Sequence, residues 1–178
     1  MIKKLFITLL FASIGLVAIS QSNTANPPVL LVEKLKIFEP YFGKYQHTMD
    51  YAGTKWKGTM EVNPIIKGWY VDWTIYTRSE DNKFDREYHM LVTYDTVKNK
   101  YRVWRFETTP PAEAEPTLRT EGTDIIVEMN LTRNGSVVNF YNRYILDGKD
   151  GVKIITESRT PEGQKIRDIG VTLGRRIK

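Results

Sequence analysis

The feature that most constrains this chain is a succession of short segments rich in Tyr, Trp, Val, Ile and Thr, separated by turn signals from Gly43 onward. This composition, with its alternation of apolar and polar residues, predicts β-strands. The Asn134-Gly135 dipeptide tolerates positive φ at both central positions of a hairpin turn. We expect ten strands, at residues 44–51, 55–62, 69–78, 88–95, 100–108, 117–122, 124–131, 137–146, 152–160 and 165–176.

The links between these segments are too short for helices, and nothing after Pro40 shows helical periodicity. Parallel strands need crossovers of about a dozen residues, so neighbouring strands here should be antiparallel. A long meander also has to hide its edges, and closure into a barrel removes them. We therefore expect an all-β fold, an antiparallel up-and-down β-barrel of about ten strands. A two-sheet sandwich is the alternative.

Residues 1–20 have the layout of a secretory signal peptide. Lys3 and Lys4 form a positive start, residues 5–18 are almost unbroken apolar, and Ala18-Ile19-Ser20 is a small-x-small cleavage site. The apolar run is shorter than the ~20 residues of a comfortable membrane span. We expect cleavage, a periplasmic or secreted mature protein and no stable membrane insertion afterwards, with an uncleaved anchor as the alternative.

The rest of the chain divides into a leader and one domain. Residues 21–28 are polar, end in a Pro pair and are expected to be flexible. Residues 29–178 have the length of a single domain that can build a core without disulfides. Within it, residues 29–38 carry apolar side chains at spacings of four and three. This spacing predicts a short amphipathic helix that Pro40 ends.

Composition excludes several classes of protein. The chain has no cysteine, which rules out thiolate zinc sites, redox motifs, cysteine nucleophiles and a lipid-modified N-terminal cysteine. Its formal net charge of +5 falls to +3 without Lys3 and Lys4. Such a small surplus, spread among mixed charges, argues against nucleic-acid binding.

Alternation along each strand separates an inward set of side chains from an outward set. We assign the more apolar set of each strand to the interior, which becomes bulky and aromatic. Eight strands enclose room for one small ligand, and ten enclose more. The inward rings either pack a solid core or line a cavity. The candidate ligand-binding residues are Tyr45, His47, Trp56, Trp69, Trp73, Tyr88, Met90, Tyr94 and Asn142.

The sequence contains few residues in patterns that are typical of catalytic or metal sites. His47 falls in an inward set and His89 in an outward one; for His47 a core role, a ligand contact and metal or haem ligation all stay open. No His-x-His, clustered-carboxylate or Gly-x-Ser-x-Gly pattern occurs, so we assign no metal, cofactor or catalytic residue. The basic end, residues 175–178, is expected to be frayed, with anion binding as the alternative. Carboxylates expected on the solvated outer face are Asp72, Glu128, Glu157 and Asp168.

Several short motifs resemble known domains. Residues 38–45, Phe-Glu-Pro-Tyr-Phe-Gly-Lys-Tyr, resemble the opening of bacterial calycin-type domains, where a helix leads through a glycine into an aromatic first strand. Residues 66–70, 91–95 and 100–104 resemble a bacterial lipocalin-like family of unknown function, in which a Gly-Tyr-Asp element precedes a Lys-Tyr-x-x-Trp strand. The likeness covers most of the mature chain in order and spacing.

The chain departs from that family at two positions. Tyr45 stands where a Trp is usual, and Thr93 replaces the glycine before Tyr94-Asp95. The resemblance implies a ten-stranded calycin barrel and brings no catalytic residues, and fold alone does not decide function.

These observations favour an exported barrel that binds a small apolar or amphipathic molecule. One alternative is an enzyme, an isomerase, cyclase or hydrolase, that uses the same cavity. Another is an envelope interaction module with a solid barrel, which would bind through the Pro-rich connection at residues 109–116. The pattern specifies no oligomeric state.

Overall fold

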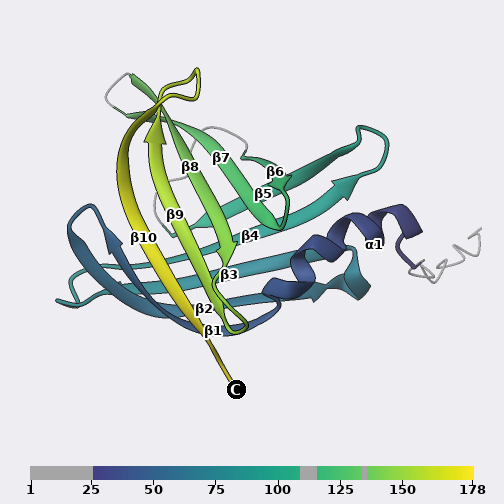
Figure 1. Ribbon diagram of the computed structural model, residues 1–178, viewed down its shortest axis with the longest axis horizontal. Helices are drawn as coiled ribbons and strands as arrows, with labels where there is room; N and C mark the ends of the chain where they lie inside the picture. The colour runs from purple at the N-terminus through teal and green to yellow at the C-terminus, as the bar shows by residue number, and fades with distance from the viewer. Residues whose placement is uncertain (1–25, 109–115, 134–135) are drawn as a thin grey trace, which may run out of the picture.

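The computed structural model describes residues 26–108, 116–133 and 136–178. It consists of a short helical segment followed by ten strands, with a 3-10 turn, Ile66–Gly68, between the second and third strands (Figure 1). All ten predicted strands are confirmed, with ends shifted by a few residues. The expected signal peptide, most of the expected leader and most of the 109–116 connection lie outside the described residues, as does the expected turn at Asn134-Gly135. The strands are β1 (Gly43–Tyr51), β2 (Thr54–Ile65), β3 (Tyr70–Ser79), β4 (Asp85–Asp95), β5 (Lys100–Glu107), β6 (Thr117–Glu121), β7 (Asp124–Arg133), β8 (Ser136–Leu146), β9 (Gly151–Arg159) and β10 (Lys165–Ile177).

The strands form one antiparallel sheet that curls into an up-and-down barrel (Figure 1). Each strand pairs with its neighbour in sequence, except that β5 is followed by the other edge strand, β6, while β1 pairs with β10. β5 and β6 lie side by side and form a seam without a strand ladder between their described residues. The structure is therefore the nearly closed barrel that the sequence predicts and not a sandwich.

The predicted helix is present, but its second part is a 3-10 helix instead of an α-helix. The α-helix α1 spans Val29–Leu35 and continues as a 3-10 helix, η1, over Lys36–Tyr41 with Pro40 inside it. The proline ring would clash with the carbonyl four residues earlier in an α-helix, so the chain tightens before it ends. No helix in the described ranges is long and apolar enough to cross a membrane.

The helical segment covers one end of the barrel, which we call the helix end. Its buried side chains are Leu31, Leu35, Phe38 and Tyr41, which join the hydrophobic core of the barrel. The Tyr41 hydroxyl lies 3.0 Å from the carbonyl oxygen of Tyr144. These contacts close the helix end with apolar surface, and we call the opposite half of the barrel the far half.

The basic chain end is ordered, so the expectation of a frayed terminus is wrong. Arg176 lies in β10 opposite Tyr45 of β1. Its Nη2 donates hydrogen bonds to the Pro40 carbonyl at 3.0 Å and to the Tyr45 hydroxyl oxygen at 2.9 Å. The guanidinium also lies 5.4 Å from the centre of the Tyr45 ring. Arg176 therefore ties the last strand, the first strand and η1 together.

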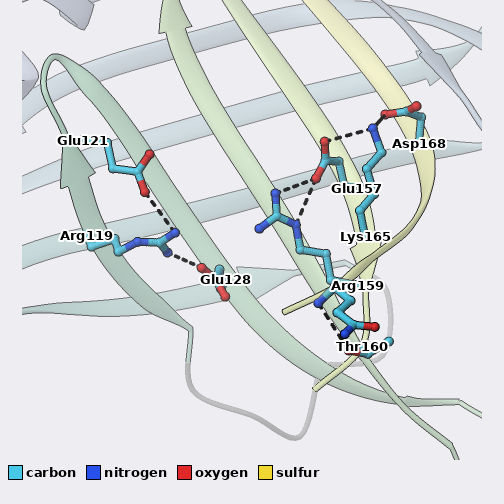
Figure 2. Close-up of polar contacts among 9 residues, drawn as sticks. Arg119, Glu121, Glu128, Glu157, Arg159, Thr160, Lys165 and Asp168 are labelled. Carbon is cyan, nitrogen blue, oxygen red and sulfur yellow. Dashed lines mark hydrogen bonds and ion pairs between the residues drawn. The ribbon is translucent and has the colours of Figure 1, made fainter. Parts of the chain in front are cut away.

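A charged network lies on the outer face of the last strands (Figure 2). Glu157 of β9 accepts hydrogen bonds from Arg159 at 2.7 and 2.9 Å and pairs with Lys165 at 3.2 Å. Lys165 also pairs with the exposed Asp168 at 2.7 Å. Because the Glu157 side chain is only 13% exposed, the expectation that this carboxylate is solvated is wrong.

The same network buries an outward tyrosine. On β6, Arg119 pairs with Glu121 and with Glu128, whose side chain is only 25% exposed (Figure 2). The guanidinium of Arg159 lies 3.3 Å from the centre of the Tyr141 ring. Tyr141 is thereby buried although it stands on the outer face, as is its outward-facing neighbour Ile126. Long arginine side chains cover apolar surface in this way while their charged ends stay in ion pairs.

Candidate functional site in the barrel interior

A row of inward residues crosses four strands in the far half. Strand pairing places His47 opposite Gly58, Gly58 opposite Thr77 and Thr77 opposite Arg86. Directly paired residues of antiparallel strands share a face. His47 and Thr77 are each 4% exposed, which identifies that face as the inner one. The row therefore forms part of the inner wall.

Glycines shape this wall beside His47. A Cβ at Gly58 would stand 1.9 Å from the Tyr76 carbonyl oxygen, so no side chain fits where β2 bends against β3. On the other side, Gly174 of β10 pairs with His47. The imidazole consequently has no directly paired side chain on either neighbouring strand.

Four buried polar atoms that face the interior have neither a hydrogen-bond partner nor an ion-pair partner in the described structure. They are His47 Nδ1, Trp56 Nε1, Trp73 Nε1 and Thr77 Oγ1. A buried polar group without a partner costs about 1–3 kcal/mol. Native proteins satisfy nearly all such groups, so a cluster of them calls for a partner such as water or a ligand. Trp56 lies two residues before Gly58 on the same face, which places three of these atoms around one stretch of wall.

Several inward-facing residues of the far half are partly exposed. Other inward residues of the same half, such as Trp56, Met129 and Phe140, are buried beside them. Asn142 Oδ1 accepts a hydrogen bond of 2.9 Å from the Thr156 hydroxyl, and both residues face inward, as predicted for Asn142. The half-buried inward residues are Met49, Tyr51, Arg86, Tyr88, Arg105, Glu107, Asn142 and Thr156.

The His47 ring is neutral at neutral pH. Burial lowers the pKa of His47 from 6.5 to about 4. A neutral imidazole has one nitrogen that donates and one that accepts, so His47 can hydrogen-bond a hydroxyl, an amide or a carbonyl group. Within the described ranges, no three His, Cys, Asp or Glu side chains come together in a group that could hold a metal ion.

An ion pair inside the barrel went unpredicted. Arg105 and Glu107 of β5 pair with each other, and Arg105 Nη1 donates to Met129 Sδ of β7 at 3.0 Å, across the seam. The Arg105 guanidinium lies 4.6 Å from the centre of the Tyr88 ring. Burial raises the pKa of Tyr88 and, to a smaller extent, that of Tyr144, so both hydroxyls stay protonated and can donate hydrogen bonds.

The strand register of β5 explains why the Arg105–Glu107 pair faces inward. Val103 lies opposite the buried Val92 and Arg105 opposite the buried Met90, which puts Arg105 on the inner face. Hydrophobicity suggests the other set, because Trp104 and Phe106 alternate with the charged residues.

The predicted ligand-binding residues divide into two groups. Four lie in the far half: His47, Trp56, Tyr88 and Asn142. The other five lie deeper or toward the helix end: Tyr45, Trp69, Trp73, Met90 and Tyr94.

The deeper group belongs to the core. Tyr45, Trp73 and Met90 are almost fully buried, and the Trp73 ring packs 4.5 Å from that of Tyr144. Tyr94 donates a hydrogen bond to Asn99, and the Trp69 carbonyl accepts one from Thr93. Of this group, only Trp73 presents an unpartnered polar atom to the interior.

No family model matches the chain, and no curated protein matches it either. Among solved structures, an S-type phycobiliprotein lyase from Guillardia theta is 12% identical, with a TM-score of 0.49 over 83% of this chain and 93% of the lyase. A de novo designed fluorescence-activating β-barrel is 12% identical, with a TM-score of 0.42 over 78% of this chain and 95% of the design. A redesigned β-barrel bound to DFHBI is 14% identical, with a TM-score of 0.42 over 77% of this chain and 99% of the other. At these values none of the three says which residues of this chain act or on what.

Proposed function

We propose that this protein binds a small apolar or amphipathic molecule in the far half of its barrel. The observation that carries the proposal is the cluster of unpartnered polar atoms on the inner wall at His47, Trp56 and Thr77. Small-molecule sites combine an apolar wall with a few convergent polar groups, which is the composition found here. A ligand with a hydrogen-bonding edge would satisfy groups that the protein leaves unpaired.

The inner wall also supplies apolar contact surface beside these polar atoms. Trp56, Met129 and Phe140 face inward, and the hydrogen-bonded Asn142–Thr156 pair stands close to them in the ladder. The rings would hold the body of the ligand, and the polar groups would orient it. This arrangement favours binding over the alternative of a solid barrel that acts only through its loops.

The binding test uses a neutral fluorophore and a pair of neighbouring residues. Thr156 faces inward and Ile155 outward on β9. N-phenyl-1-naphthylamine, which is uncharged and brightens in apolar surroundings, should bind the wild-type protein. Thr156→Phe should weaken binding by roughly tenfold or more because the added ring occupies inner space, whereas Ile155→Phe should not.

Two outcomes would contradict the proposal. One is the absence of fluorophore binding to folded wild-type protein, and the other is equal weakening by the inward and outward variants. Thermal unfolding of both variants checks that neither has lost the fold. Native mass spectrometry of protein purified from its own source should then show a co-purified small molecule.

We also propose that the protein is exported, as its first twenty residues indicate, and acts in the periplasm or after secretion. Support comes from the charged start, apolar run and small-residue site of the sequence. The resemblance to a bacterial lipocalin-like family belongs to the same proposal. The intact mass of the mature protein should lack the residues up to about Ser20, and an unprocessed mass in the envelope would contradict export by cleavage.

A further inference from the structure

Arg86 is the charged member of the inner row. It lies on β4 opposite the buried Thr77, so its side chain starts from the inner face. Its guanidinium carbon lies 5.3 Å from the centre of the Trp56 ring and 5.6 Å from that of Tyr51. Arg86 therefore spans from β4 toward aromatic rings on β1 and β2, across the wall that carries the unpartnered atoms.

The charge of Arg86 is not balanced by the described protein. No carboxylate in the described ranges lies within ion-pair distance of it, whereas the other half-buried inward arginine, Arg105, is paired with Glu107. The neighbouring rings attract a cation but carry no net charge to neutralise it. This stretch of inner wall thus has one positive charge in excess.

We propose that Arg86 receives the carboxylate of an amphipathic ligand whose apolar body lies against Trp56. A guanidinium offers parallel N–H donors that match a carboxylate with two hydrogen bonds. A single free cation suits a monoanion, since a dianionic phosphate would call on a second cation and Arg105 is already neutralised by Glu107. The unpartnered atoms of Thr77 and His47 continue the same row beyond Arg86.

This inference rests on the proposed function and names its ligand class. The experiment compares two fluorophores that differ only in the head group, 1-pyrenebutyrate and 1-pyrenebutanol, with energy transfer from the protein tryptophans as the signal. Wild-type protein should bind the carboxylate roughly 10-fold to 100-fold more tightly than the alcohol, the range typical of one charge-assisted interaction. That comparison needs no variant.

A matched pair of variants then locates the effect. Arg86→Met should bring the ratio of the carboxylate affinity to the alcohol affinity close to one. Arg102→Met is the control, because Arg102 makes the same kind of contact, 4.8 Å from the centre of the Trp104 ring, on the outer face of the neighbouring strand. It should leave both affinities as in the wild type.

The outcomes separate the two proposals. Equal affinity of wild-type protein for both probes would overturn the carboxylate assignment and leave small-molecule binding intact. A preference that survives in Arg86→Met would overturn the role of Arg86. Failure of both probes and of the neutral fluorophore to bind would overturn the proposed function itself.

Discussion

At the scale of single residues, His47 shows how a polar group becomes available to a ligand. Its strand alternation carries the ring inward, and its position between Gly58 and Gly174 keeps paired side chains away from it. The ring is buried without a partner for Nδ1. Such an imidazole resists protonation because the interior solvates the charged form poorly.

This resistance makes stability depend on pH. Burial holds the pKa of His47 near 4 in the folded protein, against an ordinary value of 6.5. Between these values the unfolded chain binds a proton that the folded chain does not, so the free energy of unfolding falls as the pH falls through this window. Urea unfolding of wild type and His47→Gln should show that the stability difference between them shifts by about 1–3 kcal/mol from neutral pH to about pH 4.5.

His89→Gln serves for comparison, because it removes the only other histidine, which lies on the outer face. This variant shows whether the pH dependence of stability comes from burial of the imidazole or from the loss of any imidazole. A stability difference between wild type and His47→Gln that stays constant over this pH range would contradict the prediction.

At the scale of elements, the outer face of β6 to β10 is held by ion pairs as well as by backbone ladders. Glu157 is the central acceptor, since it contacts Arg159 on its own strand and Lys165 on β10 (Figure 2). Arg159 in turn covers the Tyr141 ring. Partial burial makes these contacts less screened than ordinary surface pairs.

Loss of the Glu157 charge should therefore lower the stability of the folded protein. Glu157→Gln should lower the free energy of unfolding by about 1–2 kcal/mol, because two cations lose their acceptor. Glu121→Gln is the matched control on β6: its side chain is half exposed and, among the described residues, forms an ion pair with Arg119 alone, so the loss should stay below about 0.5 kcal/mol. Urea unfolding measures both, and equal losses would contradict the central role of Glu157.

At the scale of the whole molecule, the two junctions of the barrel are closed differently. β1 and β10 share a full ladder that Arg176 reinforces at the helix end. β5 and β6 meet only side by side, and beyond the short β6 the side chain of Arg105 reaches Met129 of β7. The barrel is thus most strongly connected between β1 and β10 and most weakly connected at the β5–β6 seam.

Arg176 should accordingly contribute more to the free energy of unfolding than its neighbour Arg175. Arg176→Met removes hydrogen bonds to Pro40 and Tyr45 and should lower the free energy of unfolding by about 1–3 kcal/mol. Arg176→Lys should restore only part of it, because the shorter lysine side chain loses the planar guanidinium that lies beside the Tyr45 ring even where its ammonium reaches an acceptor. The exposed Arg175, paired with Asp147, is the control, and Arg175→Met should cost less than about 1 kcal/mol. Chemical denaturation distinguishes the three, and full recovery with lysine would refute the argument.

Strand positions, hairpin order and most inward faces could be predicted from sequence, because alternation and turn chemistry are local properties of the chain. The inward placement of His47, Trp56 and Asn142 followed from the same alternation. Local pattern failed where charged and aromatic residues alternate, as at Arg105 and Trp104, since the charged set faces inward there.

Tertiary structure decided what the local pattern leaves open. Tyr141 is buried on the outer face because Arg159 of the neighbouring strand covers its ring, and Arg86 on β4 reaches rings on β2 and β1 because the sheet curls across β3. The division has a physical cause: a strand's alternation is set by its own backbone, whereas the partner of a long charged side chain depends on which distant strands the barrel brings beside it.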